Sequence, residues 1–138
     1  MNTRPLLSTS NRALAAGVAV IALAACTTPG PRERQAARLA EFEAVAGEPV
    51  ERFHFWDLQR WEVLGPYEIA VWTRINEAWL IRVNRPCAGL EFAQTIGLSS
   101  NQNMVSTRFD AVLFERQRCN IREIRPVDGK ALKRLAKD

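Results

Sequence analysis

The chain has 138 residues, of which 47% are hydrophobic, and its 19 basic and 15 acidic residues give a formal charge of +4. This length fits one small domain and leaves no room for several. Residues 1–25 contain Arg4 and Arg12 but no acidic residue, so their removal leaves 17 basic and 15 acidic residues. A net charge of only +2 gives no indication of a nucleic-acid partner.

Residues 13–25 form an apolar run behind two basic residues, which is typical of a signal peptide. The run is shorter than the roughly 20 residues that a membrane-spanning helix needs. Leu23-Ala24-Ala25-Cys26 resembles the lipobox of bacterial lipoproteins, in which the cysteine receives lipid and becomes the first residue after cleavage. We predict a lipoprotein signal peptide at residues 1–25 and lipidation at Cys26. The alternatives are an ordinary secretory peptide cleaved at Ala22-Leu23-Ala24 and an uncleaved anchor helix.

Lipidation at Cys26 predicts a protein of the bacterial cell envelope that is anchored to a membrane, because two or more acyl chains hold a protein stably. The residue after the cysteine is Thr27 rather than aspartate. By resemblance to enterobacterial sorting, this favours the outer membrane, with the protein facing the periplasm.

Residues 26–48 are predicted to hold the lipidated N-terminus, a linker and one helix at residues 31–46. Pro31 suits the first turn of a helix, and Gly47 and Pro49 end it. Its apolar stripe, Leu39, Phe42 and Val45, indicates packing against the domain rather than a free stalk.

Residues 49–138 are predicted to form a small α+β domain. Residues 50–55 and 57–64 have β-like composition, and residues 67–73 and 78–83 flank a turn of hairpin length. A short helix is expected at residues 90–96 and a loop at 99–107. A second hairpin is expected from residues 111–115 and 119–124, and Asp128 is expected to cap a last helix at 129–136. The predicted fold is a small antiparallel β-sheet or partial barrel with an N-terminal helix, short flanking helices and one disulfide.

Cys87 and Cys119 are the two cysteines that remain once Cys26 is assigned to lipid. In the oxidising periplasm, this even number predicts a disulfide that stabilises the fold by about 3–4 kcal/mol in the chain-entropy model. A metal site and a redox pair are the alternatives. Structural zinc usually takes four cysteine or histidine ligands, and redox pairs usually have Cys-x-x-Cys spacing. We therefore expect neither a metal nor a cofactor.

Four segments carry a resemblance to a known family. They are Cys87-Ala88-Gly89-Leu90, Ile96-Gly97-Leu98, Phe109-Asp110-Ala111-Val112 and Cys119-Asn120-Ile121-Arg122-Glu123-Ile124. Together they resemble an uncharacterised family of small proteobacterial proteins, often lipoproteins, over residues 50–127. The resemblance implies a paired Cys87 and Cys119 and an envelope location, and it brings no catalytic residues.

His54 is the single histidine of the sequence. It would need a nucleophile or a polarising partner to act as a base, and Asp57 and Asp110 are the conceivable partners. Strand alternation places His54 opposite Phe53 and Phe55, and this favours a solvent-facing structural role.

The candidate binding surface consists of aromatic and basic side chains. Of the four tryptophans, Trp56 and Trp72 are predicted to be exposed, whereas Trp79 joins the core with Ile81 and Val83. Arg116, Arg118 and Arg122 form a predicted basic strip for phosphate groups or an acidic partner, partly neutralised by Glu115 and Glu123.

We therefore expect an envelope lipoprotein whose domain binds an envelope protein or a lipid head group without catalysis. The alternatives are a small periplasmic enzyme that uses His54 and a thiol redox protein that uses Cys87 and Cys119.

Overall fold

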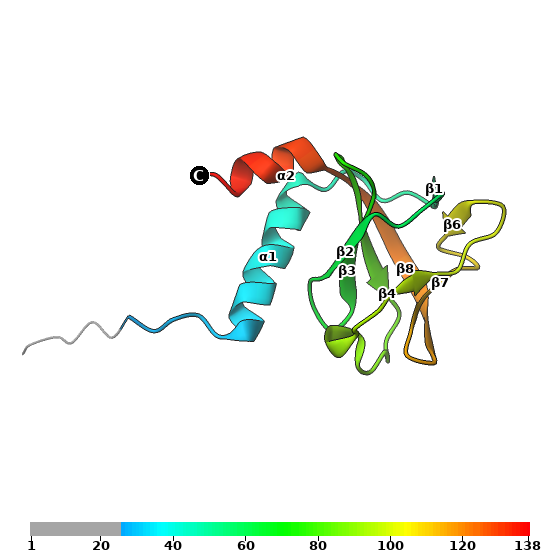
Figure 1. Cartoon of the computed structure of the whole chain (residues 1–138), viewed down its shortest axis with the longest axis horizontal. Coiled ribbons are helices and arrows are strands. Elements are labelled where there is room, and N and C mark those ends of the chain that lie inside the picture. The colour runs from blue at the N-terminus through cyan, green and yellow to red at the C-terminus, as the bar shows by residue number, and fades with distance from the viewer. Residues whose placement is uncertain (1–25) are drawn as a thin grey trace, which may run out of the picture.

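The structure is a computed structural model that describes residues 26–138, so the predicted signal peptide at 1–25 lies outside the described residues. Two helices lie on one side of a curled six-stranded antiparallel sheet, and a two-stranded sheet lies on its other side (Figure 1). This confirms the predicted α+β partial barrel with an N-terminal helix. The elements are α1 Pro31–Val45, β1 Arg52–His54, β2 Arg60–Val63, β3 Glu68–Arg74, β4 Glu77–Val83, η1 Leu90–Phe92, β5 Gly97–Leu98, β6 Met104–Ser106, β7 Ala111–Phe114, β8 Gln117–Asp128 and α2 Gly129–Leu135.

The six-stranded sheet has the order β2-β3-β4-β8-β7-β5, with every neighbouring pair antiparallel. Both predicted hairpins are confirmed, as β3–β4 and β7–β8. The second is longer than expected, because β8 continues to Asp128 and pairs with β4 as well as β7. Its register shifts where Arg82 pairs with Glu123 and Val83 with Ile121, so Arg122 is an extra residue in β8. Such a bulge bends a strand and increases its twist, which curls the sheet.

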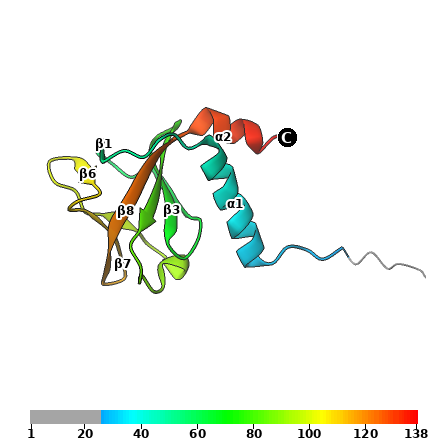
Figure 2. The ribbon, with the colours of Figure 1, turned by 180° about the vertical axis from the view of Figure 1, so that it is seen from behind.

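Two hydrophobic cores lie on opposite faces of the sheet. They form because β3 and β4 carry apolar residues at even-numbered and at odd-numbered positions, which point to opposite faces. Ile69, Val71 and Ile81 belong to the core inside the curl. Ala70 and Leu80, which alternate with them along the strands, belong to the core between the outer face and the two helices. Figure 2 shows α1 and α2 on that outer side from behind.

α1 packs on the sheet, as its apolar stripe predicts. Phe42 is fully buried, and Leu39 and Val45 are half-buried beside it. The helix ends at Val45 because Ala46 adopts an extended conformation and bridges to Val127 of β8.

The prediction of a short helix at residues 90–96 is wrong for most of that segment. Only one 3₁₀ turn forms, at Leu90–Phe92, because Ala93 is already extended and the chain then enters β5. The extension lets Gly97 and Leu98 pair with β7. Long-range strand pairing thus overrides the local helix preference.

The predicted loop at residues 99–107 is also corrected, because it contains β6, which pairs with β1. Asn101 and Met104 hydrogen-bond to each other across a two-residue turn in which Gln102 and Asn103 have φ of 52° and 60°. This left-handed turn usually holds glycine, and the sequence gives no such signal here.

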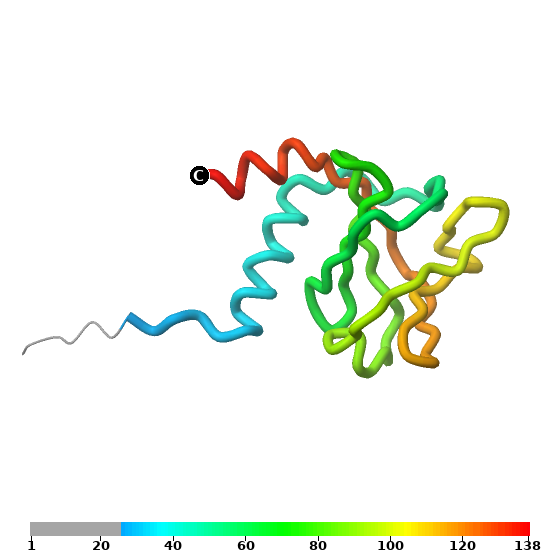
Figure 3. Tube along the Cα trace, in the orientation of Figure 1, coloured from blue at the N-terminus to red at the C-terminus, as the bar shows by residue number. Residues whose placement is uncertain are grey.

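The last helix confirms its predicted cap. Asp128 accepts hydrogen bonds from the backbone N–H groups of Lys130 and Ala131, at 2.8 and 3.2 Å. Gly129, the first residue of α2, donates its N–H to the Asn76 carbonyl in the β3–β4 turn at 3.1 Å. The tube in Figure 3 shows that α2 lies at the C-terminal end of α1, whereas residues 26–30 leave the domain at the other end of α1.

Candidate binding surfaces

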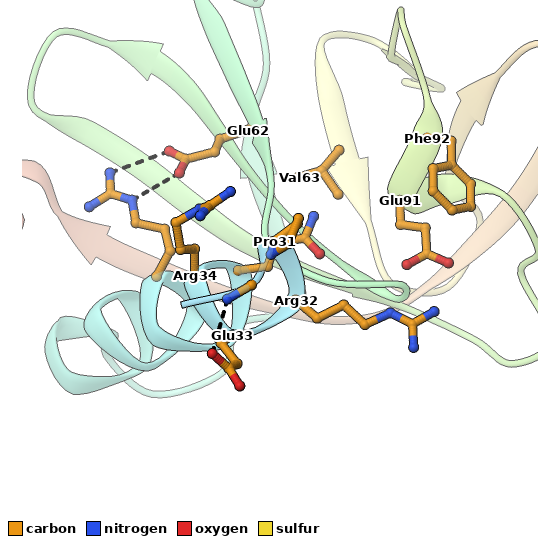
Figure 4. A pocket seen from close by; sticks show the side chains of 11 residues that line it. Pro31, Arg32, Glu33, Arg34, Glu62, Val63, Glu91 and Phe92 are labelled. Atoms are coloured by element: carbon orange, nitrogen blue, oxygen red, sulfur yellow. Dashed lines mark hydrogen bonds and ion pairs between the residues drawn. The ribbon is translucent and has the colours of Figure 1, made fainter. Parts of the chain in front are cut away.

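A cleft of about 830 Å³ lies between the first half of α1, the edge strand β2 and η1 (Figure 4). It is formed by elements that are distant in sequence, since α1 ends at Val45 and η1 begins at Leu90. Its lining residues are Gly30, Pro31, Arg32, Glu33, Arg34, Gln35, Arg38, Glu62, Val63, Glu91 and Phe92.

The two long walls of the cleft are joined by Arg38 of α1 and Glu62 of β2. Arg38 Nε and Nη2 donate to the two carboxylate oxygens of Glu62 at 2.8 and 3.3 Å, and Nη1 donates to Glu41 at 2.6 Å. The hydrogen bond to Glu62, opposed by burial and helped by Glu41, raises the pKa of Arg38, so the guanidinium stays charged. Arg38 therefore fixes the width of the cleft.

The rim of the cleft is open to solvent and partly aromatic. Phe92 is 69% exposed, whereas Leu90 and Ala93 of the same segment are buried. Val63 contributes a half-buried apolar wall, and Arg32 lies exposed on the first turn of α1. Apolar and guanidinium groups side by side suit the binding of an amphiphilic partner.

Of the two tryptophans predicted to be exposed, Trp56 is 72% exposed. The prediction for Trp72 is wrong, because this residue is only 4% exposed. The strand pattern indicated a polar face beside Glu68 and Arg74, but α1 covers that face. Phe42 packs edge to face on Trp72, and the guanidinium carbon of Arg60 lies 3.8 Å from the centre of its ring.

The predicted core residue Trp79 is half-buried in the inner core, where its ring stacks on Phe53 at 4.6 Å between ring centres. Its indole N–H donates to the hydroxyl of Thr73 at 3.1 Å.

Arg116, Arg118 and Arg122, the predicted basic strip, are all exposed. Arg116 lies in the β7–β8 turn with φ of 103°, and Arg118 Nη2 donates to the Phe109 carbonyl at 3.0 Å. Glu123, which is expected to neutralise part of the strip, accepts a hydrogen bond from Arg82 on the neighbouring strand at 2.6 Å. The role of the strip in binding stays a prediction.

Cys87 and Cys119 form the predicted disulfide, with their Cα atoms 5.8 Å apart. Both residues are buried, at 4% and 6% exposure. Cys26 is exposed and takes no part in a disulfide within the described residues. The cysteines are therefore divided as predicted, although lipidation of Cys26 stays a prediction.

His54 is exposed on β1, opposite the buried Phe53, as strand alternation predicts. Asp57 accepts the Leu58 N–H at 2.8 Å. Within residues 26–138, no hydrogen bond joins His54 to Asp57 or Asp110. The same part of the chain contains no group of three histidine, cysteine or acidic side chains that could hold a metal ion.

Asp110 is a buried carboxylate, at 6% exposure, beside a hollow of about 520 Å³ next to the two-stranded sheet of β1 and β6. Its oxygens accept hydrogen bonds from the Ser99 hydroxyl at 2.9 Å and the Ser106 N–H at 2.7 Å. Ser99 in turn accepts the Ala111 N–H at 2.8 Å. Asp110 therefore joins the segments that lead into and out of β6.

The cleft residues Arg32, Val63 and Phe92 were missed by the sequence reasoning. For Phe92 a signal was present: Leu90 and Ala93 lie three residues apart and share a helical face, which leaves Phe92 off that face. No comparable signal places α1 beside β2, because that contact joins segments more than twenty residues apart.

No helix in residues 26–138 is long and apolar enough to cross a membrane. Comparison with curated proteins and with solved structures found no match. The sequence model of a family of unknown function, DUF6491, matches residues 9–138, almost the whole chain. The chain therefore belongs to this family of unknown function.

Proposed function

We propose that this protein is a bacterial envelope lipoprotein, anchored through lipid on Cys26 to the outer membrane and facing the periplasm. Its domain is a binding module without catalysis, whose partner is an envelope protein or a lipid head group rather than nucleic acid. The observation that carries the proposal is Cys26 itself. It follows Leu23-Ala24-Ala25, is exposed, and precedes the first residue of α1 by five positions.

The disulfide supports the envelope location. Bonds such as Cys87–Cys119 form and persist in oxidising compartments and are rare in the reducing cytosol. Once its sulfur carries lipid, Cys26 can no longer form a disulfide with Cys87 or Cys119. The modification therefore also protects the Cys87–Cys119 pairing. The covalent lipid supplies the membrane attachment, since each buried CH₂ contributes about 0.8 kcal/mol.

Cys26→Ser tests the anchor, with Thr27→Ser as the matched control that leaves the thiol in place. Each variant is expressed in a bacterium fed an alkyne analogue of palmitate, and membrane and soluble fractions are compared. We expect Cys26→Ser to lose the label and the membrane association, while Thr27→Ser keeps both. A Cys26→Ser variant that stays in the membrane fraction would contradict the anchor.

Thr27→Asp tests the proposed destination. In an enterobacterial host, we expect the wild-type protein in the outer-membrane fraction and the variant in the inner-membrane fraction. Identical fractionation of the two proteins would contradict sorting through Thr27.

The partner is tested by crosslinking in cells followed by mass spectrometry. Trp56 and Ile75 are both highly exposed and lie in different loops. We expect Trp56→Ala to lower the yield of the principal protein or lipid adduct several-fold and Ile75→Ala to leave it unchanged. Equal yields would remove Trp56 from the binding surface.

A further inference from the structure

The folded domain begins at Pro31, the first residue of α1, only a few residues after Cys26. Five residue steps separate Cys26 from Pro31, and a fully extended chain covers at most about 18 Å over that distance. A lipid on Cys26 therefore keeps the start of α1 within that distance of the membrane. The structure that surrounds this point is thus the part of the domain nearest to the lipid.

Local hydrogen bonds close the start of α1. Gly30 donates its N–H to Glu33 at 3.0 Å, and Arg34 Nη1 donates to the Pro29 carbonyl at 2.6 Å. Farther along the helix, Arg38 is bonded to Glu62 of β2, and Phe42 is fully buried against the sheet. α1 is thus bound to the sheet, so the tether keeps this end of the domain close to the membrane.

An exposed aromatic side chain lies at the same end of the molecule. Phe92 shares the cleft with Pro31 and Arg32, and Figure 4 shows it in η1, across from the first turn of α1. The residue is 69% exposed. Arg32, on the facing wall, forms no ion pair with a carboxylate of residues 26–138.

We propose that the end of the domain formed by the first turn of α1 and by η1 rests on the lipid bilayer that holds Cys26, with Phe92 inserted at the interface. This inference rests on the proposed function, since it needs the lipid on Cys26. An exposed phenylalanine gains free energy by leaving water for the boundary between head groups and acyl chains. Arg32 is placed to donate hydrogen bonds to lipid phosphate.

The charge at this end decides between two kinds of membrane contact. Arg32 and Arg34 are accompanied by Glu33 and Glu91 in the lining of the same cleft, so the surface carries no net positive charge. The contact therefore depends on aromatic insertion and on the tether, and not on attraction to an anionic surface. It is expected to persist at high salt, where purely electrostatic binding is screened.

Phe109 provides a matched control. It is 76% exposed, and it lies in the β6–β7 connection, on the side of the sheet remote from α1 (Figures 1 and 2). The photoreactive residue p-benzoylphenylalanine is placed at position 92 or at position 109 of the full-length protein. Each purified lipidated protein is reconstituted into vesicles of phosphatidylethanolamine and phosphatidylglycerol, illuminated, and analysed by mass spectrometry for phospholipid adducts.

We expect a several-fold higher yield of phospholipid adducts at position 92 than at position 109, and the same ratio when the salt concentration is raised. Equal yields, a higher yield at position 109, or loss of the difference at high salt would each overturn the inference. Failure of the proposed anchor gives a different result, because mass spectrometry would then find no lipid on Cys26 before illumination.

Discussion

Phe42 of α1 packs edge to face against Trp72 of β3, with their ring centres 5.5 Å apart. This contact turns the outer face of the sheet into a second core. Arg38, one turn earlier in α1, lies over the same phenylalanine ring at 4.8 Å and bonds to Glu62 of β2 at 2.8 Å, which adds a second contact between the helix and the sheet. The helix that leads from the predicted lipid anchor is thus part of the folded domain.

Phe42→Ala is expected to lower the free energy of unfolding by about 3–5 kcal/mol, because it leaves a cavity beside Trp72 and removes the aromatic pair. Urea unfolding followed by tryptophan fluorescence measures the change. Phe109→Ala, at an exposed site, serves as the control and is expected to stay within about 0.5 kcal/mol of wild type. Similar losses in the two variants would contradict the packing of α1.

Removal of the disulfide by the double substitution Cys87→Ala and Cys119→Ala is expected to lower the free energy of unfolding by about 3–4 kcal/mol. The bond closes a segment with a sequence separation of 32 residues, which restricts the unfolded chain. Denaturant midpoints of the variant and the wild type, both without reductant, measure the loss.

The burial of the same two sulfurs predicts that mild reductant leaves the bond intact in the native protein. Alkylation with a maleimide after reduction, with and without urea, measures this protection. Rapid reduction of the folded protein would instead favour a thiol redox function.

Gly129→Ala is expected to lower the free energy of unfolding by about 1–3 kcal/mol, since an added Cβ would meet backbone atoms of Asn76 at 2.9 Å. The β3–β4 turn and the start of α2 would have to separate. Gly30→Ala is the matched control, because no atom lies within 4 Å of its added Cβ. Thermal unfolding of both variants tests the difference, and equal melting temperatures would contradict close packing at Gly129.

Asp128 gives the stability a dependence on pH. The N–H groups of Ala131 and then Lys130 lower the pKa of its carboxyl below the unfolded value. The stabilisation is therefore fully present above the unfolded pKa of about 3.9 and is lost as the pH falls through the lower folded pKa. Asp128→Asn is expected to reduce the urea midpoint more at about pH 6 than at about pH 2. An equal reduction at both pH values would contradict this role of the carboxylate.

Local sequence features determined much of this protein. The apolar stripe and flanking proline residues predict α1 almost to the residue, and strand alternation predicts both hairpins and the outward direction of His54. Asp128 in the sequence predicts the N-terminal cap of α2. The count and spacing of cysteines favour the disulfide that forms. Each of these features depends on neighbours within a few residues or on simple pairing, which a sequence displays directly.

The tertiary structure alone decided which surfaces stay open. Trp72 is buried because α1 packs on a face of the sheet that the strand pattern predicts to be polar and exposed. β6 forms because it pairs with β1, which lies about fifty residues earlier in the chain. The cleft with Phe92 exists because Arg38 joins α1 to β2. Burial and pairing of this kind depend on segments distant in the chain, whose approach is fixed by the packing of the whole domain and by no local pattern.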